Sequence, residues 1–172
     1  MDKILAIAVN TFREAVRDKI LYSLLIFALL MIVSSVFLST LSVGDQIKII
    51  KDMGLSMISI FGTLIAIFVG IGLVYKEIEK RTIYSIIAKP IARHQFLMGK
   101  YCGLILTLLV EITVMSSGFL LLLYFYPGSY DASILKAIYL IFIELMIITA
   151  IALLFSSFST PILSGIFTLL FF

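Results

Sequence analysis

Charged residues leave long parts of the chain apolar. Residues 20–44 and 53–75 carry no charge, and residues 101–130 carry only Glu111. A helix needs roughly 20 apolar residues to cross about 30 Å of hydrocarbon. The sequence therefore predicts four membrane spans and the start of a fifth, at residues 20–43, 53–75, 101–126, 137–155 and 162–172. Helices are expected because backbone groups in lipid must be satisfied within the segment, and the short alternating strands of a barrel do not occur in the pattern.

The fifth apolar run follows the polar residues 156–161 and ends at Phe172 after eleven residues. That length is too short to cross a bilayer. We therefore expect residues 1–172 to form a single transmembrane domain that is the N-terminal piece of a longer chain, truncated within its fifth span.

Residues 3–18 show a different pattern, with apolar residues recurring at helical spacing. Leu5, Val9, Phe12 and Val16 share one face of a helix, and polar side chains occupy the opposite face. This predicts an amphipathic helix that lies in the membrane interface and does not cross it.

The composition excludes a water-soluble fold. Of the 172 residues 62% are apolar and 13% are charged, with a mean hydropathy of +1.22. A soluble domain is about half apolar and about a quarter charged, and a chain of this size has too little interior to bury the excess. The expected fold class is all-α, a polytopic bundle of transmembrane helices whose main surroundings are the lipid bilayer. One cysteine excludes a disulfide framework.

The 13 basic residues are distributed unevenly between the two sides of these spans. Ten lie before the first span or in residues 76–100, and only Lys48, Lys51 and Lys136 lie on the other side. By the positive-inside rule the N-terminus and the 76–100 loop are cytoplasmic. Nucleic-acid binding is not expected, because spans separate the basic residues and acidic residues alternate with them.

The 76–100 loop is longer than a simple connection requires. Apolar residues recur at helical spacing up to Ile87, Glu77 and Arg81 form an i, i+4 pair, and Pro90 disfavours helix at Lys89. We expect an amphipathic helix at residues 76–89 along the inner face, suited to docking a cytoplasmic partner. An ordinary interfacial helix without a partner explains the pattern about equally well.

The motifs of this loop resemble the first cytoplasmic loop of ABC-2-type permeases. That loop has an acidic pair followed by Thr, a Pro-hydrophobic-x-Arg turn and a Gly-Lys pair before the next span. The nearest resemblance is to the branch that includes the permease of the nitrous-oxide-reductase copper-maturation system. Residues 9–19 also resemble the amphipathic N-terminal helix of that family. The loop residues that carry the resemblance are Glu77, Glu79, Arg81, Thr82, Lys89, Pro90, Arg93, Gly99 and Lys100.

The resemblance implies a six-span permease subunit of an ATP-binding-cassette exporter in the cytoplasmic membrane of a prokaryote. Two such subunits would pair, most simply as a homodimer, and each would dock a cytoplasmic ATPase that carries ATP and Mg. The 76–89 helix would then be the coupling helix, and the loop residues from Glu77 to Arg93 would be the contacts. The chain would not be an enzyme by itself. Its one Gly-Lys pair is followed by Tyr101 and lacks a phosphate-binding loop, so no cofactor is expected on it.

Two carboxylates interrupt the apolar runs. Glu111 lies about 16 Å beyond Lys100 and Glu144 about 12 Å beyond Lys136, so both are expected near the membrane midplane. Ionised residues at this depth usually face a bundle interior or a water-filled cavity. If the two are neighbours they could share a proton. They are candidates for a transport path, a cation site or a proton relay, and the alternative is an ordinary helix-packing contact.

Two other functions are alternatives to the exporter. The first is an ion- or proton-coupled secondary transporter that works through Glu111 and Glu144, which an inverted repeat in a second half of the chain would support. The second is an intramembrane hydrolase, which ranks last because the chain has no buried Ser-His pair. No metal site is expected either, since the single histidine, His94, has no neighbouring ligand residue in sequence.

Overall fold

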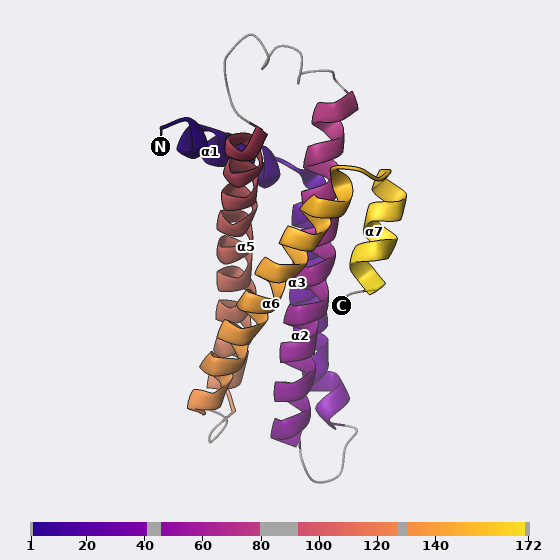
Figure 1. Ribbon diagram of the computed structural model, residues 1–172. Coiled ribbons are helices and arrows are strands. Elements are labelled where there is room, and N and C mark those ends of the chain that lie inside the picture. The colour runs from indigo at the N-terminus through magenta and orange to yellow at the C-terminus, as the bar shows by residue number, and fades with distance from the viewer. Residues whose placement is uncertain (1, 41–45, 80–92, 127–130, 171–172) are drawn as a thin grey trace.

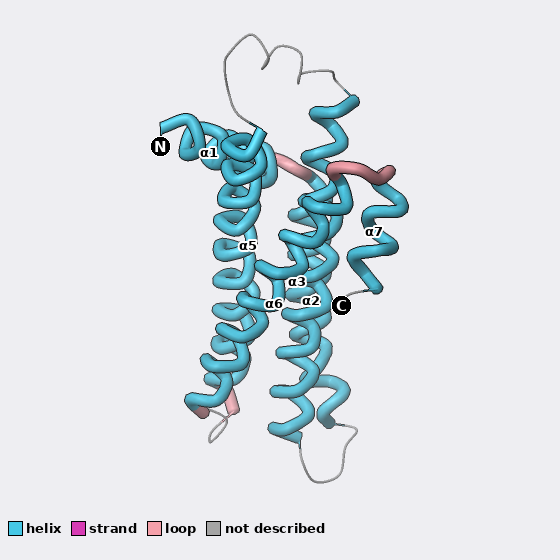
Figure 2. The backbone as a smooth tube through the Cα atoms, viewed as in Figure 1, coloured by secondary structure: helices cyan, strands magenta, loops and turns pink. Residues whose placement is uncertain are grey.

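The computed structural model describes residues 2–40, 46–79, 93–126 and 131–170. Within these residues every regular element is a helix (Figure 2). Four of the helices are long and apolar enough to cross a membrane. This confirms the predicted all-helical polytopic bundle. The helices are α1 (Asp2–Val16), α2 (Lys19–Thr40), α3 (Gln46–Glu79), α5 (Arg93–Tyr124), α6 (Ala132–Ser156) and α7 (Pro161–Leu170).

The long helices α2, α3, α5 and α6 run up and down beside one another, and α1 lies across one end of them (Figure 1). The end of α3, the start of α5 and the turn from α6 into α7 lie at that same end. Helix α7 turns back along the bundle and packs against α3 and α6. Helix α3 is central, since it contacts each of the five other helices in the described part of the chain.

Two helices extend beyond the spans that hydropathy marks. Helix α3 begins at Gln46 and continues to Glu79, although the span was expected to end at residue 75. Helix α5 begins at Arg93, eight residues before the expected start of its span. Apolar content marks only the part of a helix that lies in lipid. The ends of a helix depend on the helix propensity of the residues there, and Lys, Glu, Gln, Leu and Met are good helix formers. Residues 76–79 therefore continue α3 and do not begin a separate helix; residues 80–89 of the expected coupling helix lie outside the described residues.

Helix α1 packs on α5 with a different face from the apolar stripe that its sequence shows. Ala8, Thr11 and Ala15 are buried, whereas Leu5 is 68% exposed. Ala8 and Ala15 lie about a quarter turn around the helix from Leu5. Helix α1 therefore has two apolar surfaces, one packed within the chain and one, containing Leu5 and Val9, left open for lipid.

Glycines set the distance between the crossing helices. A Cβ atom added at Gly103 would lie 2.6 Å from the carbonyl oxygen of Ala8, and one at Gly99 would lie 2.7 Å from Cβ of Ile7. Helices that pack in lipid gain little from the hydrophobic effect, so small residues that let backbones approach closely are favoured. Gly99 thus serves the α1–α5 contact. Lys100 beside it is buried, and its Nζ lies 5.7 Å from the ring centroid of Phe96 on the same helix.

Other glycines of α3 receive large side chains from its neighbours. Gly54 faces the ring of Phe119 on α5, and Gly62 faces Leu145 on α6. Both partner side chains are fully buried. These two contacts set how closely α5 and α6 approach α3.

The α1–α5 contact gives a first prediction. Replacing Gly103 by Ala should destabilise the protein by about 1–3 kcal/mol, because the added methyl group meets the backbone of α1. Gly72→Ala is the matched control, since a Cβ atom there has no neighbour within 4 Å. Thermal unfolding of the detergent-solubilised protein measures both. Equal melting temperatures for the two variants would contradict the described crossing.

Candidate functional site

Glu144 lies at the middle of α6 and meets the middle of the apolar part of α3. It is the central residue of Ala132–Ser156, and Ser59 is the central residue of Gln46–Gly72. The Ser59 hydroxyl donates a hydrogen bond to Oε2 of Glu144 over 3.4 Å. Both side chains are half-buried. The pair therefore places a carboxylate at mid-depth that is incompletely covered by the described part of the chain.

Ser59 belongs to a line of polar residues along α3. Asp52, Ser56, Ser59 and Thr63 follow one another at intervals of four, three and four residues, which places them on one face of the helix. The line leads from the end of the helix near Gln46 to the midplane. Thr63 is 1% exposed and its hydroxyl has no hydrogen-bond partner among the described residues. A helical hydroxyl usually donates to its own backbone, as Ser56 does to the carbonyl oxygen of Asp52 at 2.7 Å.

Glu111 occupies a different environment, in the interior of the bundle. It is 2% exposed, and no donor from the described residues reaches either of its carboxylate oxygens. Gly118, seven residues on and so on nearly the same face of α5, approaches Leu29 of α2. Leu104, seven residues before Glu111, lies 3.8 Å from a Cβ atom added at Gly70 of α3. Glu111 therefore lies on the inward side of α5, which faces α2 and α3.

The structure thus gives the two carboxylates similar depth but different neighbours. Glu144 accepts a hydrogen bond from Ser59, and Ser59 lies about 140° around the axis of α3 from Gly54. Gly54 marks the side of α3 that receives α5. A hydrogen-bonded pair of Glu111 and Glu144 is not formed, because the oxygens of Glu111 have no hydrogen-bond partner in the part of the chain that the structure describes.

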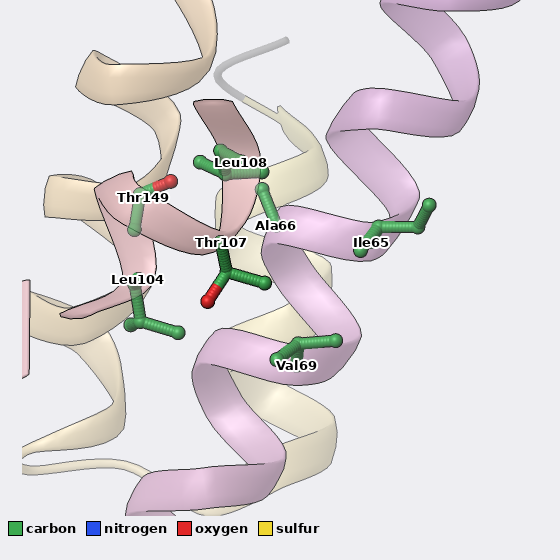
Figure 3. A pocket seen from close by; sticks show the side chains of 7 residues that line it. All are labelled: Ile65, Ala66, Val69, Leu104, Thr107, Leu108 and Thr149. Atoms are coloured by element: carbon green, nitrogen blue, oxygen red, sulfur yellow. The ribbon is translucent and has the colours of Figure 1, made fainter. Parts of the chain in front are cut away.

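A small cavity lies where α3, α5 and α6 meet (Figure 3). Its volume is about 10 Å³, close to the least that holds one water molecule. The hydroxyls of Thr107 and Thr149 at its wall donate to the carbonyl oxygens of Gly103 and Leu145 in their own helices. The cavity is therefore a packing gap, too small for a transported molecule. Its other lining residues are Ile65, Ala66, Val69, Leu104 and Leu108.

The predicted coupling residues lie at or beyond the ends of α3 and α5. Glu77 and Glu79 are in the last turn of α3, and Arg93 is the first residue of α5. Arg81, Thr82, Lys89 and Pro90 lie outside the described residues. Both helix ends lie at the end of the bundle that α1 crosses (Figure 1).

The sequence was compared with known proteins. Residues 5–172 match the model of the ABC-2 family transporter proteins. The chain belongs to the ABC-2 transporter family. A search of curated proteins gives no match.

Membership of the ABC-2 family makes this chain a membrane subunit of an ABC transporter, which is not itself catalytic. The four apolar helices agree with a multi-pass membrane protein. Among the residues described in this ABC-2 protein, no group of three or more His, Cys, Asp or Glu is placed to hold a metal ion.

Sequence reasoning missed Ser59 and Thr63, because isolated hydroxyls in an apolar run read as ordinary packing residues. The spacing of Asp52, Ser56, Ser59 and Thr63 is the signal that identifies them, since four polar residues on one face of a spanning helix are costly if they face only lipid. The sequence does not show which residue of this line lies beside Glu144, because that depends on how α3 and α6 pack together.

The isolation of Glu111 gives a second prediction. Glu111→Met should stabilise this ABC-2 protein by about 1–3 kcal/mol, because a buried carboxylate without a donor is replaced by an apolar side chain of similar size. Thermal unfolding in detergent measures the change. Glu144→Met is the control, and no gain is expected there because the Glu144 carboxylate is half-buried and already accepts a hydrogen bond. A lower melting temperature for Glu111→Met would mean that Glu111 has a stabilising partner.

Proposed function

We propose that this ABC-2 protein is the permease subunit of an exporter in a prokaryotic cytoplasmic membrane, working as a pair of subunits with a separate ATPase. The observation that carries the proposal is the family match over residues 5–172, together with four helices that can span a membrane. Within the family, the loop motif around Glu77 and Pro90 favours the branch of the nitrous-oxide-reductase maturation permeases.

The distribution of basic residues supports a cytoplasmic position for the end of the bundle that α1 crosses. Lys3, Arg13 and Lys100 lie at that end, whereas Lys48 and Lys136 lie near the starts of α3 and α6 at the opposite end. Basic residues accumulate on the cytoplasmic side of membrane proteins. The N-terminus and the segment between α3 and α5 are then available to a cytoplasmic partner.

We assign ATPase docking to the segment that joins α3 to α5. Glu77, Glu79, Arg81 and Thr82 would form the first part of the contact, and Lys89, Pro90 and Arg93 the second. Helix α3 extends past its uncharged run, which ends at Tyr75, to Glu79. This last turn carries the acidic pair about 3–6 Å beyond Tyr75, to the level of the membrane surface where a cytoplasmic protein could meet it.

We also assign mid-depth carboxylates to the transport path, with different roles. Glu144 is half-buried beside the polar line of α3, so a substrate can reach it without the bundle opening. Glu111 is enclosed, and would meet a substrate only if α5 moved relative to the helices around it. Glu144 is therefore the first residue to test.

A third prediction concerns docking. Replacing Glu77, Glu79 and Arg81 together by Ala should lower the amount of co-purified ATPase by about tenfold or more, because several contact residues are removed at once. The chain is co-expressed with the ATPase of the adjacent reading frame, and the amount retained after affinity purification is measured.

The matched control replaces Lys48, Lys51 and Lys136 by Ala, which changes the same number of charged residues at the other end of the bundle. Full ATPase retention is expected for this control. Full retention by the Glu77, Glu79 and Arg81 variant would reject the docking segment, and no ATPase binding by the unaltered protein would reject the exporter.

A further inference from the structure

Helix α1 has a basic side besides its packed side and its open apolar side. Arg13 and Arg17 are exposed and lie four residues apart, which places them on one side of the helix. The helical turn continues to Arg17, because its backbone N–H donates to the carbonyl oxygen of Glu14 over 3.2 Å. At 100° per residue, this basic side lies nearly opposite Ala8 and Ala15, which pack within the chain. The basic side therefore points away from α5.

The open apolar side of α1 adjoins the basic side. Leu5 and Val9 are 68% and 37% exposed, and Arg13 follows Val9 by about one helical turn. Exposed apolar residues are unfavourable in water, whereas the arginines need a polar environment. A helix with two such sides lies in the membrane interface, where its apolar side meets acyl chains and its basic side meets head groups.

The position of α1 along the bundle agrees with this level. Helix α1 crosses α5 at Gly99 and Gly103. Between these glycines stands Tyr101, where the long apolar run of α5 begins. Tyr22, near the start of α2, is 49% exposed, and tyrosines are enriched at the boundary between membrane and water. Helix α1 therefore lies where lipid head groups meet the protein.

The acidic residues closest to the basic side do not lie on it. Asp18 accepts a hydrogen bond from the backbone N–H of Ile20 over 3.0 Å, which holds its carboxylate at the start of α2. Glu14 is half-buried and lies between the basic side and the packed side of α1. Lys19, the first residue of α2, is exposed and adds a third cation. An anion from outside the chain would balance these exposed positive charges.

We propose that Arg13, Arg17 and Lys19 bind the phosphate groups of anionic phospholipids, so that α1 recognises the charge of the membrane. Guanidinium groups bind phosphate through two parallel hydrogen bonds, and basic residues beside a membrane attract its anionic lipids. The acyl chains of a lipid held in this way would lie along Leu5 and Val9. A soluble anionic partner would fit the cations but not the apolar side next to them.

Selective quenching by lipids tests this surface. The chain contains no tryptophan, so Val9→Trp places one reporter a turn from Arg13. The protein is held in phosphatidylcholine nanodiscs with a rising fraction of a lipid brominated in its acyl chains, either phosphatidylglycerol or phosphatidylcholine. Bromine quenches tryptophan at short range, so the lipid fraction that gives half-quenching reports which lipid lies beside α1. Both leaflets have the same composition, so the result does not depend on the orientation of the protein.

We expect phosphatidylglycerol to reach half-quenching at a fraction at least about fivefold lower than phosphatidylcholine does. Each basic residue near an anionic surface strengthens binding about fivefold. Replacing Arg13, Arg17 and Lys19 together by Gln should remove the preference. Replacing the two arginines by Lys should keep most of it, because the positive charge remains.

Two controls accompany the test. Replacing Lys48, Lys51 and Lys136 by Gln removes the same charge at the opposite end of the bundle, and the lipid preference should persist in that variant. Leu30→Trp places a reporter on α2, where Leu30 is 61% exposed, about 16 Å beyond Lys19. The two brominated lipids should quench this reporter equally, and equal quenching in the Gln variants shows that they remain inserted in the bilayer.

Other results would overturn the proposal. Equal quenching of the Val9→Trp reporter by the two lipids would mean that α1 does not recognise lipid charge. An unchanged preference after the replacement of Arg13, Arg17 and Lys19 would reject these residues. Loss of the preference in the Lys48, Lys51 and Lys136 variant as well would mean that it reflects the net charge of the chain. Protection of the reporter from both lipids would mean that protein covers this side of α1. No ATPase takes part, so these outcomes are independent of the docking experiment that tests the exporter.

Discussion

The arrangement of the bundle depends on the close approach of helices at glycine residues. The bilayer offers no water, so every backbone group must be bonded within its helix, and helices associate by fit and not by removal of apolar surface from water. Gly54 and Gly62 admit Phe119 and Leu145 into the surface of α3. Gly99 and Gly103 admit α1 onto α5 in the same way. If these positions were filled, α5 and α6 would stand further from α3, and Ser59 would no longer reach Glu144.

Because the bilayer interior lacks water, a polar side chain without a hydrogen-bond partner in the protein is a stronger sign of a functional role than one that bonds its own helix. Most hydroxyls in the described helices donate to a carbonyl oxygen of their own helix, as Thr107 and Thr149 do, and so cost little. Thr63 and Glu111 lack such a partner among the described residues. Glu111 is enclosed within the bundle, whereas the Glu144 carboxylate is half-buried and accepts a hydrogen bond from Ser59.

Local composition predicted the four long apolar helices of the described residues, because apolar length is a property of each segment alone. It also placed Glu111 and Glu144 correctly near the middle of their helices. It did not predict that α3 continues to Glu79. The last residues of this helix are mostly polar, so hydropathy does not mark them, but they have a high helix propensity. Nor did it predict the face of α1 that packs on α5, because small residues such as Ala8 carry little weight in an apolar pattern. The pairing of Ser59 with Glu144 depends on how two helices dock, which no single segment specifies.

The continuity of α3 connects the two ends of the proposed mechanism. The helix carries Ser59 at the middle of its apolar part and Glu79 at its end, about 30 Å away. It contains no proline, and its residues are helical throughout, so it has none of the proline kinks that would absorb a movement. A displacement imposed at Glu79 by a docked ATPase would therefore reach Ser59 as a shift or tilt of the whole helix. Glu144 belongs to α6, which meets α3 through packing and through the Ser59–Glu144 hydrogen bond, so such a movement would change the Ser59–Glu144 distance. In the proposed exporter, the continuous helix α3 would therefore link movement of the docked ATPase to the surroundings of the Glu144 carboxylate.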